Sequence, residues 1–131
     1  MRNAVLALAL ALAPAIATAD APRQFDLACK GTVTPLDGPA PAPWGERISV
    51  DLGAGAWCVQ PCATPKAIKR VEPGEIWLED DRTPENRDPT LAALFVNRAT
   101  GELKGQDAGV ARRYDATCAI AAFTPLPKAL F

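Results

Sequence analysis

The chain has 131 residues, with 14 Lys+Arg, 15 Asp+Glu and no His, and its formal net charge is −1. The absence of His excludes Ser-His-Asp and Cys-His catalytic groups and every zinc site with an imidazole ligand. The nearly neutral charge argues against a nucleic-acid-binding protein, because such proteins need a surplus of basic residues.

Residues 1–19 have the pattern of a secretory signal peptide. Arg2 is followed by an unbroken run of Ala, Leu and Val over residues 4–13, and small residues at 17–19 allow cleavage before Asp20. This run is about half of the roughly 20 apolar residues that a membrane-spanning helix needs. We therefore expect a single mature domain of residues 20–131 that does not span the membrane and is periplasmic or secreted.

All four cysteines, Cys29, Cys58, Cys62 and Cys118, lie in the expected mature chain. An even number of cysteines in an exported protein predicts two disulfides. Of three possible pairings we favour Cys58–Cys62, which closes a tight turn, with Cys29–Cys118, which would join the first strand to the last. The alternatives are a four-cysteine zinc site and a redox pair. Only one pair is close, and its spacing is one residue longer than Cys-x-x-Cys.

The N-terminal half of the mature chain predicts three strands. Residues 24–34 alternate between apolar and polar, which is typical of a half-buried strand. Residues 35–45 contain four Pro and two Gly and predict a loop that is partly polyproline II. Residues 46–52 alternate again, residues 53–55 form a turn, and residues 56–60 return as a short strand, so that these segments together predict a hairpin.

The C-terminal half continues this pattern. Residues 66–71 predict a weak strand, and a Pro-Gly turn separates it from a short strand at 75–79. Residues 80–89 form a charged loop. Residues 90–98 fit either a helix capped by Asp88 or a strand before a hairpin turn, and we favour the strand. The final strands are predicted over two segments, 109–114 and 117–123.

Seven or eight short strands at intervals of roughly 8–12 residues predict an all-β fold. We expect a small antiparallel meander, closed into a barrel or a sandwich and stapled by the disulfides.

Three segments carry a resemblance to known proteins: residues 25–32 (FDLACKGT), 51–58 (DLGAGAWC) and 97–101 (NRATG). Their order resembles a group of small exported bacterial proteins without a known activity, and the resemblance implies no activity for this chain. The opening strand with an early cysteine also resembles the small-barrel lysozyme inhibitors of the periplasm. The chain departs from these inhibitors because its one serine, Ser49, cannot supply their serine-containing inhibitory loops.

Residues 79–88 are the densest cluster of charge, with five carboxylates. Carboxylates are ligands for Ca²⁺, but their order does not match an EF-hand, and Arg82 and Arg87 reduce the local charge from −5 to −3. We therefore expect a solvated loop whose charges pair with each other. The alternatives are a calcium site and a contact surface for a basic partner.

Tryptophans are the other candidates for recognition. By alternation Trp57 points away from Cys58, and Trp77 points away from its neighbours Ile76 and Leu78. If the cysteine side is the core, both rings lie on the outer face, where packing in a second small core is the interpretation that we favour over a binding role. The residues that we retain as candidate partner contacts are Trp57, Trp77, Asp80, Asp81, Glu85 and Asp88.

No pattern marks a nucleophile or a pair of buried carboxylates, so we expect neither an enzyme nor a cofactor or metal. The leading hypothesis is an exported, non-catalytic binding module for an unknown protein or envelope component, including an inhibitor-type role. The alternative is a carrier that holds a small apolar ligand in the interior of a barrel. We expect a monomer.

Overall fold

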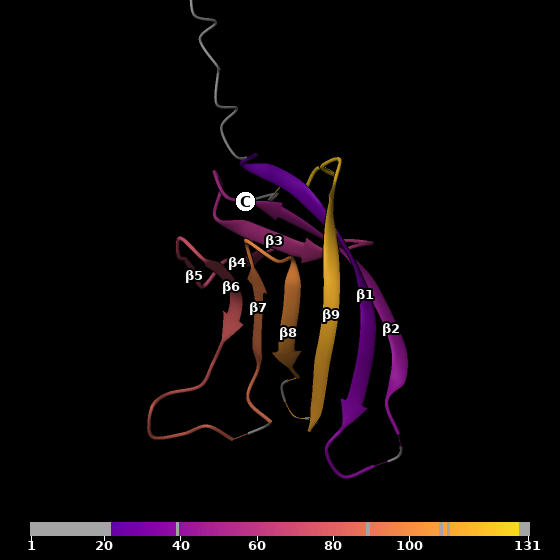
Figure 1. Cartoon of the computed structure of the whole chain (residues 1–131). Helices are drawn as coiled ribbons and strands as arrows, with labels where there is room; N and C mark the ends of the chain where they lie inside the picture. The colour runs from indigo at the N-terminus through magenta and orange to yellow at the C-terminus, as the bar shows by residue number, and fades with distance from the viewer. Residues whose placement is uncertain (1–21, 39, 89, 108, 110, 129–131) are drawn as a thin grey trace, which may run out of the picture.

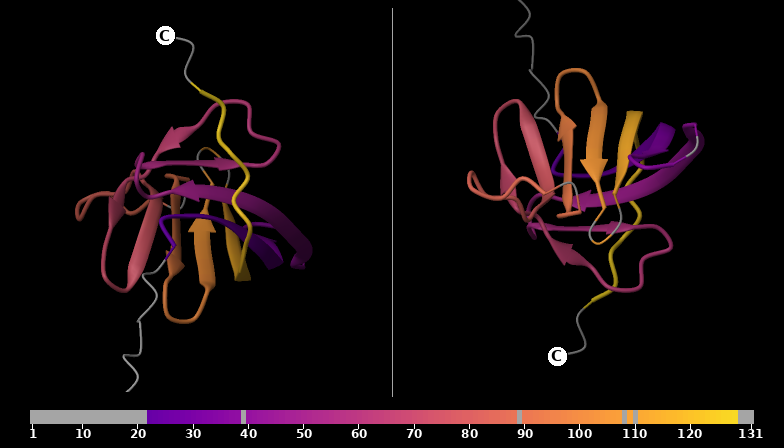
Figure 2. Two further views of the ribbon diagram at one scale, coloured as in Figure 1. Left: turned by 90° about the horizontal axis from the view of Figure 1, so that it is seen from above. Right: turned by 90° about the horizontal axis from the view of Figure 1, so that it is seen from below.

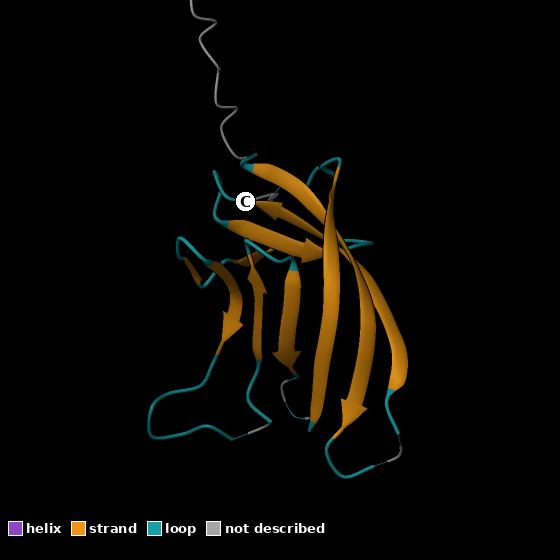
Figure 3. Cartoon of the chain, in the orientation of Figure 1, coloured by secondary structure: helices purple, strands orange, loops and turns teal. Residues whose placement is uncertain are grey.

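The computed structural model describes residues 22–128 except 39, 89, 108 and 110, so the predicted signal peptide lies outside the described residues. The described part of the chain contains nine strands (Figures 1 and 3). None of its residues forms a helix long and apolar enough to cross a membrane. The strands are β1 (Gln24–Pro35), β2 (Ala42–Asp51), β3 (Ala56–Val59), β4 (Lys66–Ala67), β5 (Arg70–Val71), β6 (Glu75–Asp80), β7 (Ala93–Asn97), β8 (Glu102–Gln106) and β9 (Arg112–Ala121).

All nine strands belong to one antiparallel sheet, in the order β4-β3-β2-β1-β9-β8-β7-β6-β5. Within this order, chain neighbours pair with each other except where β1 pairs with β9, the last strand. The edge strands β4 and β5 are consecutive in the chain, so the sheet has to curl for its two edges to approach each other (Figure 2). The prediction of an antiparallel all-β fold is confirmed, and the architecture is a curled half-barrel.

The short segment between β4 and β5 is bonded to both ends of the sheet. Ile68 N donates to Gly55 O, just before β3, and Lys69 N donates to Trp77 O on β6, each at 2.9 Å. The segment predicted as one weak strand over 66–71 is therefore two two-residue strands, one on each edge. A single strand is wrong here because the chain changes its pairing partner between residues 67 and 70.

Two other predicted boundaries are wrong. Residues 42–45 were expected in the proline-rich loop, but they begin β2 and pair with β1. An extended, proline-rich backbone is already close to strand geometry, so this pairing requires little change. The two strands predicted over 109–114 and 117–123 are one strand, β9, because residues 115 and 116 pair with β1 on one side and β8 on the other. The preference for a strand within 90–98 is confirmed by β7.

The core fills the concave face of the sheet. Eleven side chains form its buried cluster: Phe25, Leu27, Cys29, Ile48, Val50, Trp57, Ile76, Leu78, Val96, Leu103 and Ala116. Val50 and Leu103 are completely buried. The alternation of apolar residues in the sequence therefore identifies the inner face of β1, β2 and β6 correctly.

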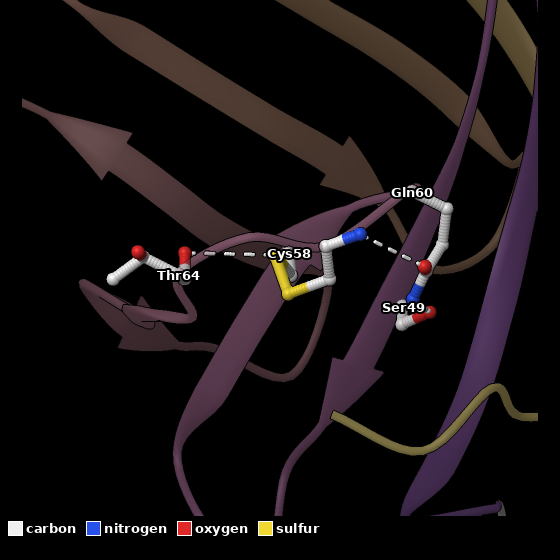
Figure 4. Close-up of a disulfide and its surroundings, with 5 residues drawn as sticks. Ser49, Cys58, Gln60 and Thr64 are labelled. Atoms are coloured by element: carbon white, nitrogen blue, oxygen red, sulfur yellow. Dashed lines mark hydrogen bonds between the residues drawn. A yellow bond between two sulfur atoms is a disulfide. The ribbon is translucent and has the colours of Figure 1, made fainter. Parts of the chain in front are cut away.

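The structure contains both disulfides that the sequence favours, Cys29–Cys118 and Cys58–Cys62. Cys29 and Cys118 are direct partners in the β1–β9 register, so this disulfide crosses between the first and last strands. The Cys58–Cys62 disulfide closes the loop after β3, with Ser49, Gln60 and Thr64 beside it (Figure 4). Two disulfides are consistent with an oxidising environment outside the cytoplasm.

We expect the two disulfides to contribute unequally to stability. Their sequence separations are 89 and 4 residues. By loop entropy, replacing both Cys29 and Cys118 with Ala should lower the free energy of unfolding by about 4–5 kcal/mol, and replacing Cys58 and Cys62 by about 2 kcal/mol. Urea unfolding of both double variants measures this difference. Equal losses would contradict the loop-entropy explanation.

The chain that follows β9 folds back over the outer face of β1 and β2 (Figure 2). Thr124 donates to the Asp26 carboxylate from its backbone N at 3.0 Å and from its hydroxyl at 2.6 Å. Arg47 donates to the same carboxylate and, at 2.9 Å, to Ala122 O. Alternation places Asp26 and Ser49 on the outer face correctly, but both are completely buried because this C-terminal segment covers them.

Asp26 makes the attachment of this segment sensitive to acid. Burial alone would raise the pKa of Asp26, but hydrogen bonds from Thr124, Ser49 and Arg47 outweigh it and lower the pKa from 3.8 to about 2. Because the folded state binds this proton more weakly than the unfolded state, the carboxylate stabilises the fold above its ordinary pKa. This contribution is lost as the pH falls from 3.8 towards 2.

We therefore expect Asp26→Asn to lower the free energy of unfolding by about 2 kcal/mol at pH 7, which is the size of the pKa shift converted to energy. The variant should also lose part of the acid dependence between pH 5 and 2, as measured by urea unfolding across this range. Part of the acid dependence of the free energy of unfolding will remain, because the pKa values of Asp51, Asp80 and Asp88 are also lowered. An unchanged acid dependence would contradict this role of Asp26.

Candidate functional site

A hollow lies beside the core on the concave face of the sheet, and we call it the inner cavity. Its volume is about 190 Å³, and β2, β3, β4, β6, β7, β8 and β9 contribute to its walls. Its lining residues are Trp44, Glu46, Ile48, Trp57, Val59, Lys66, Glu79, Ala93, Leu94, Gln106, Asp107 and Tyr114. Residues from both halves of the sheet, β2 to β4 and β6 to β9, thus meet in one place because the sheet curls.

A glycine shapes the wall of the inner cavity on β8. Gly105 is the register partner of Leu94 on β7 and of Tyr114 on β9, both of which line the cavity. A Cβ atom at this position would lie 2.7 Å from Leu94 Cδ1 and 2.7 Å from Ala93 O. Only glycine lets the Leu94 side chain pack this closely against β8.

Three aromatic side chains form much of the inner cavity. The rings of Trp44 and Tyr114 lie 5.0 Å apart at a tilt of 52°. Trp57 is 2% exposed, and its Nε1 is a buried donor for which the described residues supply no acceptor. The Lys66 ammonium lies 5.2 Å from the centre of the Trp57 ring. The walls therefore combine π faces with a buried indole donor that has no internal acceptor among the described residues.

A β-bulge turns Glu79 towards the inner cavity. The pairing of β6 with β7 shifts between Trp77, opposite Phe95, and Glu79, opposite Leu94. Leu78 is buried in the core, and Glu79, the next residue, lines the inner cavity and forms a 2.7 Å ion pair with Lys66. Strict alternation would place Glu79 on the outer side with Trp77, so sequence reasoning misses its position. A bulge redirects a side chain in this way without any local sequence signal.

The charges of the inner cavity do not cancel. Asp107 accepts hydrogen bonds from Arg112 and, at 2.6 Å, from the Tyr114 hydroxyl, and Glu79 pairs with Lys66. The Glu46 carboxylate forms no ion pair or hydrogen bond with any other residue in the described part of the chain. One carboxylate thus remains without a partner of opposite charge beside the aromatic rings.

Tyr114 is held in its neutral form by this environment. Its burial is the largest cause, followed by the hydrogen bond that its hydroxyl donates to Asp107 and by the negative charges of Asp107 and Glu46. Together they raise the pKa of Tyr114 to about 12, although the positive charge of Arg112 opposes the shift. At physiological pH the hydroxyl therefore serves as a hydrogen-bond donor and not as a base.

The structure separates the two tryptophans that the sequence grouped as candidate contacts. The expectation that Trp57 lies on the outer face is wrong: its ring belongs to the core. Alternation places it opposite Cys58 correctly, but on β3 the cysteine side is the outer one. Trp77 does lie on the outer side, stacked on Phe95 with ring centres 4.4 Å apart and with the Arg70 guanidinium 4.1 Å from its ring.

The candidate acidic residues mostly pair within their own region. Asp80 forms ion pairs with Arg70 at 3.1 Å and Arg82 at 3.0 Å, so it belongs to the surroundings of Trp77. Asp88 accepts hydrogen bonds from Thr90, while Asp81 and Glu85 are exposed. Within the described ranges, no three His, Cys, Asp or Glu side chains are arranged to hold a metal ion, so the calcium alternative gains no support.

A larger groove, of about 790 Å³, lies on the outer face between the Cys58–Cys62 loop and the C-terminal segment. Its walls are mainly Ala and Pro side chains with Phe123 and Leu126. The carboxylate at its rim, Asp51, is already bonded to Gln24 and to Ala54 N. The other charged residue of its lining is Lys128, so this groove lacks the unpaired carboxylate and the buried donor that distinguish the inner cavity.

Comparison of the chain with protein-family models, with curated proteins and with solved structures finds no match. The description of the site consequently rests on its geometry and charges.

The Lys66–Glu79 pair at the inner cavity should contribute little to stability. The side chains are 61% and 26% exposed, so water screens much of their attraction. A double-mutant cycle with Lys66→Met and Glu79→Gln, measured by urea unfolding, should give a coupling energy below about 1 kcal/mol. A coupling of several kcal/mol would mean that the pair is a structural element that cannot rearrange around a ligand.

Proposed function

We propose that the protein is an exported, non-catalytic binding module that recognises a protein or envelope component through its inner cavity. The observation that carries this proposal is the combination of three aromatic walls with an unpaired carboxylate, Glu46, and an unpartnered buried donor, Trp57 Nε1. Interior polar groups normally have partners within the protein. A carboxylate without a partner at a solvent-accessible hollow, beside a buried donor that also lacks one, is typical of a site that receives a ligand.

The surroundings of the inner cavity support binding in preference to catalysis. The only serine of the sequence, Ser49, is buried on the outer face, where Gln60 Nε2 donates to its hydroxyl at 2.8 Å. The chain contains no His to act as a base, and all four cysteines are in disulfides. Two of the three carboxylates that line the inner cavity are held in ion pairs, Glu79 with Lys66 and Asp107 with Arg112, which favours the positioning of a ligand over the transfer of a proton.

The size of the inner cavity argues for a small group of a larger partner. Pockets that enclose a whole drug-sized molecule measure about 300–1,000 Å³. The inner cavity, at about 190 Å³, suits a single side chain or headgroup, since the rest of the concave face is filled by the core. The alternative of an apolar-ligand carrier is therefore the weaker one, because no large apolar interior is left for its cargo.

Other parts of the proposal concern location and assembly. The two disulfides support a periplasmic or secreted protein. The bonds of Ile68 and Lys69 to opposite ends of the sheet support a small barrel whose seam is spanned by the β4–β5 segment. We propose that this barrel acts as a monomer.

Site-specific cross-linking in cells tests the proposal. A photoreactive amino acid replaces Val59, which is 38% exposed and lines the inner cavity. The matched control places it at Lys104, an exposed residue of β8. We expect position 59 to cross-link to one reproducible partner and position 104 to give no such product. The cross-link from position 59 should also be lost when Trp44→Ala is added. The same products from both positions would contradict a site at the inner cavity.

A further inference from the structure

We propose that the inner cavity binds the cationic side chain of a lysine or arginine in a basic segment of a partner polypeptide. This inference rests on the proposed function and specifies the chemistry of the ligand. Three independent features lead to it: the charge of the inner cavity, its aromatic walls and its unpartnered donor.

The net negative charge of the inner cavity favours a cationic ligand. Its lining holds three carboxylates, Glu46, Glu79 and Asp107, and one ammonium, Lys66, which gives a net charge of −2. Arg112, bonded to Asp107, brings this to −1. Because Glu79 and Asp107 have their partners, the remaining charge belongs to Glu46. A ligand with one positive charge would neutralise it, whereas an anion would be repelled.

The aromatic walls are suited to the same ligand. A cation within about 6 Å of a ring centre is attracted by the negative π face. Trp44 and Tyr114 lie 5.0 Å apart and are tilted, so that they form two sides of a corner. The protein already uses such a contact here, since the Lys66 ammonium lies 5.2 Å from the centre of the Trp57 ring. This internal pair demonstrates that the surroundings accept an ammonium group.

The donor of Trp57 explains why a polypeptide fits better than a simple ion. Trp57 is 2% exposed, and its Nε1 has no acceptor in the described structure. A buried donor without a partner costs free energy. A basic residue in a peptide offers a cationic end for Glu46 and, in its own peptide group, a carbonyl acceptor that can reach the buried Trp57 Nε1 once the surrounding side chains shift. A tetramethylammonium ion offers only the first.

Two properties allow such a side chain to enter. The volume of about 190 Å³ is sufficient for one long side chain. Lys66, the internal cation, is 61% exposed, so its ammonium can leave the Trp57 ring without losing much burial.

Titration of the folded protein with model compounds tests the inference. The probes are Nα-acetyl-lysine methylamide, Nα-acetyl-arginine methylamide, the norleucine analogue, which has a similar shape but no charge, and tetramethylammonium. The readout is nuclear magnetic resonance of the Trp57 indole N–H. We expect the lysine or arginine compound to bind and to shift this signal, with norleucine at least about tenfold weaker. Tetramethylammonium should also bind, but it should not produce the shift of the Trp57 indole N–H signal that a new hydrogen bond causes, because it has no acceptor.

The decisive variant is Glu46→Gln, which removes the charge and keeps the shape. It should weaken binding of the basic compound about tenfold and make affinity less dependent on salt. Glu102→Gln is the matched control, because it changes the net charge equally from an exposed position on β8 and should leave binding unchanged. If Glu46→Gln does not fold, the affinities of the lysine and norleucine compounds for the unaltered protein still test the inference.

Equal binding of the lysine and norleucine compounds, an unaffected Glu46→Gln variant, or no response to any probe at its solubility limit would overturn the inference. These outcomes differ from failure of the proposed function. If a partner is cross-linked from position 59 but the titration is negative, the inner cavity remains the proposed binding site and a basic ligand is rejected. If neither the cross-link nor a response in the titration is observed, the site itself is rejected.

Discussion

The pairing of the first strand with the last is the constraint on which the rest of the structure depends. β1 lies between β2 and β9, and the Cys29–Cys118 disulfide joins it to β9 at a direct register position. Because this contact brings the two ends of the chain to the middle of the sheet, the middle of the chain supplies both edges. The edges are then only two residues apart in sequence, and the sheet must curl. A concave face that can be filled by a core follows directly from this topology.

The curled sheet uses its two faces differently. On the outer face, the C-terminal segment buries Asp26 and binds it through Thr124, so that polar residues of two strands become interior ones. There the buried Asp26 carboxylate and Ser49 hydroxyl both have hydrogen-bond partners, which is the usual condition for buried polar groups. On the concave face, the core is apolar except at the inner cavity, where Glu46 and Trp57 Nε1 lack partners. The two faces therefore differ in that the polar groups of the outer face are bonded to each other, whereas two of those at the inner cavity have no partner among the described residues.

The candidate site brings together features that are unremarkable by themselves. Exposed carboxylates, aromatic side chains in a core and a surface ion pair occur in most proteins. Their significance lies in their arrangement, since Trp44 and Glu46 come from β2 and Tyr114 comes from β9, the two strands that flank β1, and Glu79 joins them through a bulge. An unpaired negative charge next to π faces has one simple complement, a cation, and a buried indole donor adds the requirement for an acceptor.

Features that depend on local pattern could be predicted from the amino-acid sequence. Alternation identified the strands and the core side of β1 and β2, and the even number of cysteines in an expected exported chain led to the disulfides that the structure contains. The tertiary structure alone decided which face of β3 is inside, and thereby the burial of Trp57, as well as the covering of Asp26 and the direction of Glu79. The burial of Trp57 depends on strand register, the direction of Glu79 on a bulge, and the covering of Asp26 on a segment about 100 residues away in sequence. Alternation predicts none of these, because it carries information only about neighbours along one strand.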